Sequence, residues 1–119
     1  DRINENFIRC SFFELCSRYL SSYYTFAIEQ NNSAGRSDFE MTGIPGTDYY
    51  KDDRLAEFKY FKAKEAERML ALSDPRPEDV AQVLAYAKDT KEKFPYYHVR
   101  SYIVYICANK GWKCWEVTP

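Results

Sequence analysis

Two short stretches decide the fold of this chain: Gly35-Arg36-Ser37-Asp38, and then Glu57-Phe58-Lys59 after a turn-rich gap. Each stretch belongs to a predicted strand. Side chains alternate between the two faces of a strand, so Glu57 and Lys59 point to the same face, about 6–7 Å apart along it. If the two strands pair in the register that the turn sets, Asp38 joins that face. The sequence therefore predicts two carboxylates and one amine that converge beside a hydrophobic sheet.

Such a set of groups is what metal-dependent hydrolysis of a phosphodiester needs. Mg²⁺ prefers hard oxygen ligands in octahedral geometry, with water in the remaining positions. Carboxylates of Asp38 and Glu57 on neighbouring strands would supply one side of such a site. The alternative for Glu57 and Lys59 is an ion pair on an exposed sheet face, which contributes about 0.2–1 kcal/mol.

The rest of the chain predicts an alternation of helices and strands. Hydrophobic periodicity and turn residues predict helices over 3–21, 64–72 and 77–93, strands over 23–29, 37–42, 55–61 and 101–108, and a final hairpin strand over 112–117. Pro77 fits the start of its helix, and Phe94-Pro95 ends it. This order predicts an α/β or α+β core, and several small folds would satisfy it.

Five features occur in an order that adds to this pattern. They are Glu29, Gly35-Arg36-Ser37-Asp38, Glu57-Phe58-Lys59, Gln82-Val83-Leu84-Ala85-Tyr86 and a hydrophobic strand over 102–107. In this order and spacing the chain resembles the PD-(D/E)xK nuclease superfamily. The match is closer to one branch, the nuclease-like domain at the C-terminus of bacterial AAA-ATPase-like proteins. The chain departs from the superfamily pattern at Ser37, because no proline precedes Asp38.

The resemblance implies a fold, an activity and a role for each residue. The fold would be a restriction-endonuclease-like α/β core, a mixed central β-sheet of about five strands flanked by α-helices. Asp38 and Glu57 would bind Mg²⁺ or Mn²⁺, and Lys59 would hold or deprotonate the attacking water and stabilise the pentacovalent state during cleavage of DNA. Gln82 would orient water or phosphate, or else be a solvated helix residue. Glu29 would face the same pocket.

Length and charge constrain the function. The 119 residues suit one domain over 1–119, and the formal net charge of −1 gives no global field that attracts nucleic acid. This favours an alternative function, a catalytically inactive module of the same fold that makes protein or nucleic-acid contacts beside an ATPase. The chain begins at Asp1 and has no Walker A motif, so we expect the ATPase portion to lie upstream in a longer protein.

Other residue types exclude further classes of site. None of the four cysteines forms a Cys-x-x-Cys pair, and His98 has no metal-ligand spacing to them, so no zinc site is predicted. No run of 18 apolar residues is present, and we expect a cytoplasmic protein without a membrane span. Most of the 11 tyrosines fit core positions, but Tyr49-Tyr50 and Tyr96-Tyr97 fall in loops expected to flank the site, where they could stack on bases.

Overall fold

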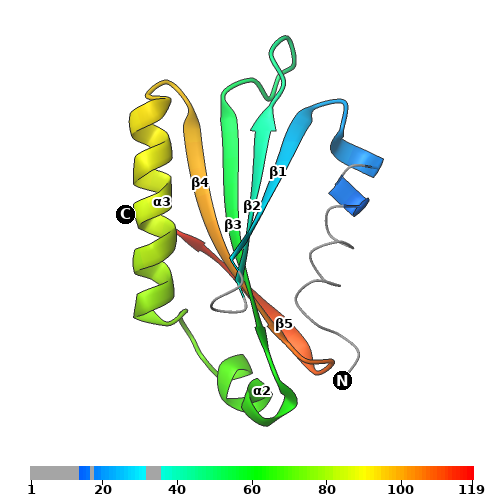
Figure 1. Cartoon of the computed structure of the whole chain (residues 1–119), viewed down its shortest axis with the longest axis vertical. Helices are drawn as coiled ribbons and strands as arrows, with labels where there is room; N and C mark the ends of the chain where they lie inside the picture. Colours follow the sequence, from blue (N-terminus) through cyan, green and yellow to red (C-terminus); the bar gives the residue numbers. More distant parts are fainter. Residues whose placement is uncertain (1–13, 17, 32–35) are drawn as a thin grey trace.

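A five-stranded mixed sheet forms the centre of the fold (Figure 1). The computed structural model describes residues 14–16, 18–31 and 36–119, and at residues 29–31 and 36–38 it describes the backbone alone. The elements in chain order are β1 (Tyr24–Asn31), β2 (Arg36–Gly43), β3 (Asp52–Phe61), α2 (Ala63–Leu70), α3 (Pro77–Lys93), β4 (His98–Cys107) and β5 (Gly111–Val117). Residues 14–16 and 18–20 are helical and residue 21 lies in a turn, while residues 3–13 and 17 of the predicted first helix lie outside the described part.

The strands lie in the sheet in their order along the chain, β1-β2-β3-β4-β5. All neighbours pair antiparallel except β3 and β4, which are parallel. Parallel strands need a crossover connection, and α2 and α3 provide it. The predicted α/β architecture, a restriction-endonuclease-like core with a mixed sheet, is confirmed.

The crossover helix α3 begins where the sequence predicts. Pro77 occupies its first position, Glu78 and Asp79 lie in the first turn, and Lys91 and Lys93 lie in the last turn. This charge order complements the helix dipole. Figure 1 shows α3 running along the sheet beside β4, while α2 lies at the end of the sheet where β3 finishes.

Helices α2 and α3 cover one face of the sheet with the larger core. Val83 of α3 and Met69 of α2 pack against Phe61, Ile103 and Tyr105 of the central strands. This face carries the odd-numbered residues of β3 and β4, because side chains alternate along each strand and the two strands are in register at equivalent positions.

The opposite face has its own core. Cys16 packs there with Phe39 of β2 and Phe58 of β3, together with the partly buried Leu20 and Val104. The central strand β3 is therefore covered on both sides, which agrees with its mixture of apolar residues.

No helix in the described part of the chain is long and apolar enough to cross a membrane.

Candidate active site

Three acidic positions line up across the first three strands. The antiparallel register pairs Glu29 with Asp38, and Asp38 with Glu57. Positions directly opposite each other in antiparallel strands lie on the same face of the sheet. The condition that the sequence analysis set for Asp38 to share the face of Glu57, a suitable register of β2 on β3, is thus met. Their row lies on the face that α3 partly covers, since Glu57 alternates in step with Phe61.

Glu57 lies on the wall of a pocket between the sheet and α3. The pocket has a volume of about 650 Å³ and also takes its lining from Glu40 of β2 and from Gln82 and Tyr86 of α3. Only 2% of Glu57 is exposed. Gln82 and Tyr86 are one helical turn apart, so both reach this pocket from the same side of α3. The structure therefore places Gln82 and Glu57 on the wall of the same pocket.

Lys59 follows Glu57 on the same face of β3 and forms an ion pair with α3. Its Nζ lies 3.2 Å from Oδ1 of Asp79, and the two side chains are 14% and 1% exposed. An ion pair with so little solvent around it is screened much less than a surface pair. The exposed ion pair considered for Lys59 is therefore not what the structure shows.

Two further groups hold the Asp79 carboxylate. Its Oδ2 accepts hydrogen bonds from Arg76 Nε, at 3.0 Å, and from the hydroxyl of Tyr105. Burial alone would raise the pKa of Asp79, but these hydrogen bonds and the charges of Lys59 and Arg76 outweigh it and lower the pKa. Asp79 is thus a buried anion, held in position next to the Lys59 ammonium group. Burial, and then the hydrogen bond to Asp79, raise the pKa of Tyr105 to about 12.

Comparison with known families shows to which family this arrangement belongs. The model of the PD-(D/E)XK nuclease superfamily matches residues 3–116 of the chain. The chain belongs to the PD-(D/E)XK nuclease superfamily. No curated protein sequence and no solved structure matches it.

One described carboxylate of this superfamily member is of the kind that binds a hard divalent cation. Glu57 supplies a buried carboxylate on the pocket wall, and the Asp38 position lies directly opposite on β2. Carboxylate oxygens are the ligands that Mg²⁺ and Mn²⁺ favour. Among the described side chains, which do not include those of Glu29 and Asp38, no group of three His, Cys, Asp or Glu residues forms a metal cluster.

Sequence reasoning missed two residues that shape the site. Asp79 falls within the predicted helix over 77–93 and Tyr105 within the predicted hydrophobic strand over 102–107, and neither was assigned to the site; the structure joins them behind Lys59. The spacing Asp79-x-x-Gln82 was a usable signal, because residues three apart share one side of a helix. No local sequence pattern indicated the contact between Tyr105 and Asp79.

A second missed pair lies further along the same face of β3. Asp53 was expected in a polar connection, but it belongs to β3 and is 1% exposed. Its carboxyl group shares a hydrogen bond with Glu40 of β2. Burial, and then this hydrogen bond and the charge of Glu40, raise the pKa of Asp53 to about 8. The raised pKa favours a proton shared by Asp53 and Glu40, which lowers the cost of burying this carboxyl group inside a strand.

The tyrosine pairs do not lie beside the pocket. Tyr49 and Tyr50 precede β3, and Tyr96 and Tyr97 precede β4, so both pairs lie at the end of the sheet where these parallel strands begin. Glu57 lies six positions after Lys51, which is about 20 Å along a strand. The expectation that these loops flank the site is corrected accordingly.

Proposed function

We propose that this chain hydrolyses phosphodiester bonds of DNA, with Asp38 and Glu57 as ligands for Mg²⁺ or Mn²⁺. The observation that supports this most is the pairing of Asp38 with Glu57 across β2 and β3, with Glu57 buried on the wall of a pocket large enough for part of a nucleotide. Membership of a nuclease superfamily adds to it. A bound cation would neutralise charge on the phosphoryl oxygens and lower the pKa of a bound water.

The residues on the sheet face that carries Glu57 have separate tasks, although Lys59 and Asp79 lie outside the pocket lining. Lys59 places a positive charge on the face that carries Glu57, where it would stabilise the negative charge that develops on the phosphoryl group. Asp79 fixes the position of that amine through the 3.2 Å contact. Gln82 presents an amide at the pocket wall, and an amide can both donate and accept a hydrogen bond to orient water or phosphate.

The wider context is also part of the proposal. Resemblance to the nuclease-like domain of bacterial AAA-ATPase-like proteins suggests an upstream ATPase portion and action on DNA in the cytoplasm.

A cleavage assay with matched variants tests the activity. We expect wild type to cut supercoiled or linear DNA only with Mg²⁺ or Mn²⁺. Asp38→Ala should reduce the rate at least about 10²-fold, since it removes a ligand of the cation, and Lys59→Met should do so by about 10²–10³-fold, since it removes a charge aimed at the transition state. Asp89→Asn is the control, because Asp89 is 63% exposed and forms a surface ion pair with Lys93 on α3.

The outcome separates the proposal from its alternative. Circular dichroism and thermal unfolding should show that every variant keeps its fold. If wild type and both site variants are equally inert on DNA and RNA with either cation, the chain is not a nuclease. DNA or protein binding without cleavage would then identify the catalytically inactive module.

A further inference from the structure

We propose that a second surface of this chain, the aromatic end, binds single-stranded nucleic acid by stacking unpaired bases on its tyrosines. The aromatic end consists of Tyr50, Lys51, Phe94, Tyr96 and Tyr97, from the loops that precede β3 and β4. It is distinct from the pocket that contains Glu57. The choice of nucleic acid as partner rests partly on the nuclease function proposed above, and the experiment is designed so that the two can fail separately.

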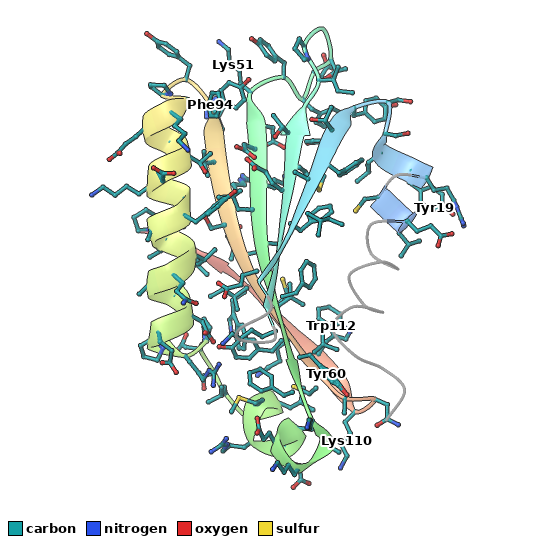
Figure 2. The ribbon with its side chains drawn as sticks, viewed as in Figure 1. Tyr19, Lys51, Tyr60, Phe94, Lys110 and Trp112 are labelled. Carbon is teal, nitrogen blue, oxygen red and sulfur yellow. The ribbon has the colours of Figure 1, made fainter. Side chains whose placement is uncertain are left out.

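The two loops of the aromatic end are joined by ring and lysine contacts. The Lys51 ammonium lies 5.6 Å from the ring centroid of Tyr50 and 5.8 Å from that of Tyr96. Tyr97 packs edge-on against Tyr50, with ring centroids 6.4 Å apart. Tyr97 also packs against Phe94 in a tilted arrangement, with ring centroids 5.1 Å apart. Figure 2 shows Lys51 and Phe94 together at one end of the molecule, with Lys110 and Trp112 at the other. The five residues of the aromatic end therefore form one continuous surface.

The rings of this surface face solvent. Tyr96 is 80% exposed, Phe94 47% and Tyr50 45%. Scattered exposed apolar residues are ordinary, but a contiguous group of them marks a binding surface. The Tyr96 ring is the most open of the three and lies beside the Lys51 ammonium. An open ring face beside a positive charge remains available to a ligand.

The backbone at Lys51 is a second, independent observation. Lys51 has a φ of 74°, in the left-handed region that favours glycine. Its carbonyl oxygen accepts a hydrogen bond of 2.7 Å from the backbone N–H of His98, which ties the two loops together. A residue with a side chain is disfavoured in this conformation, and such residues gather at binding sites. Glycine would satisfy this turn without strain. The presence of lysine here therefore indicates that its side chain has a function other than in folding.

The chemistry of the surface matches single-stranded nucleic acid. Every base has a flat π-face that can stack on tyrosine or phenylalanine, and lysine attracts the neighbouring phosphate. Lys91 brings a second ammonium to this end, because its Nζ donates a hydrogen bond to the carbonyl oxygen of Tyr97. Bases inside a duplex are already stacked on each other, so this surface should prefer single strands.

Fluorescence anisotropy with a labelled oligothymidine of about 20 nucleotides, long enough to span one single-strand site, tests the inference. The titration is done in EDTA, so that no cleavage can occur, and is repeated with a duplex of equal length. We expect wild type to bind the single strand more tightly than the duplex, and Tyr96→Ala to weaken single-strand binding about tenfold or more. Tyr19→Ala is the matched control, since Tyr19 is 67% exposed and lies at the side of the molecule beyond β1 (Figure 2).

A second variant separates binding from folding. Lys51→Gly removes the ammonium and also relieves the left-handed backbone, so thermal stability should stay equal or rise while single-strand affinity falls several-fold. Lys110→Ala removes one exposed lysine at the opposite end and should leave the affinity unchanged (Figure 2).

Three results would overturn the inference: no binding by wild type, equal affinity for duplex, or unchanged binding in both Tyr96→Ala and Lys51→Gly. A protein that binds single strands in EDTA through these residues but cuts nothing with Mg²⁺ or Mn²⁺ would support the aromatic end and reject the nuclease function. A protein that cuts DNA but binds single strands independently of Tyr96 and Lys51 would support the nuclease function and reject the aromatic end as a binding surface.

Discussion

Asp53 provides a stability prediction that does not depend on catalysis. The substitution Asp53→Asn keeps the shape of the side chain and removes its ionisable group. In the folded protein Asp53 is 1% exposed, and its pKa is raised to about 8 by burial, by the hydrogen bond and charge of Glu40, and by the charge of Asp52, while a hydrogen bond from Thr42 opposes this. In the unfolded chain the same carboxyl group returns to an ordinary pKa near about 3.9.

The sign and size of the pH effect on stability follow from the difference between the pKa of Asp53 in the folded protein and in the unfolded chain. Between about pH 4 and about pH 8 the folded state holds a proton that the unfolded state has lost. The free energy of unfolding of wild type should therefore fall by about 1.4 kcal/mol per pH unit in this window, a total on the order of 5 kcal/mol. The stability is fully present below about pH 4 and is lost as the pH rises to about 8. The amide introduced by Asp53→Asn does not titrate, so this slope should disappear in the variant.

Urea unfolding measures the effect directly. Fluorescence of Trp112 and Trp115 can report unfolding at about pH 5, about pH 6.5 and about pH 8, with EDTA present throughout. We expect Asp53→Asn to be close to wild type at about pH 5 and more stable by several kcal/mol at about pH 8. The control Asp89→Asn changes an exposed carboxylate on α3 and should follow wild type. Parallel pH profiles for Asp53→Asn and wild type would refute the protonated, buried state of Asp53.

Other predictions concern packing and the site. Gly43→Ala should destabilise the fold by more than the about 1–3 kcal/mol typical of overpacking, because the added Cβ would lie 1.6 Å from the carbonyl oxygen of Tyr49; a normal melting temperature would show that the two segments can move apart. Tyr105→Phe removes a hydrogen bond to a buried anion and should cost about 1.5–3 kcal/mol in urea unfolding; no loss would mean that the hydroxyl is dispensable. Asp79→Asn leaves Lys59 without its buried counter-charge and should cost about 3–5 kcal/mol and lower DNA cleavage, and a variant of full stability and rate would remove Asp79 from the site.

The elements with a clear period were predictable from sequence. The alternation around Glu57 indicated β3 and its face, and Pro77 with the acidic turn after it indicated the start of α3. The register of β2 on β3 was only a condition of the prediction that Asp38 shares the face of Glu57, and the observed pairing meets that condition. The position of β3 and the start of α3 depend on neighbours in sequence, so local patterns indicate them.

What failed depends on contacts between distant residues. β3 begins at Asp52 and not at Leu55, and it includes the buried Asp53, whose pKa is raised by burial and by Glu40, so the residue type alone did not indicate a strand position. The contact between Lys59 and Asp79 joins two residues that are far apart in sequence, and it exists only because α3 crosses back over the sheet. Side-chain protonation and crossover geometry are properties of the folded chain.

Calorimetric titration with Mn²⁺ tests the central claim, a cation site formed by the opposed carboxylates of β2 and β3. We expect wild type to bind Mn²⁺ with measurable heat, Glu57→Gln to lose that binding while it stays folded, and Glu116→Gln, at a half-exposed position on β5, to bind as wild type does. Mn²⁺ binding that is unchanged in Glu57→Gln, or absent from wild type, would contradict the claim.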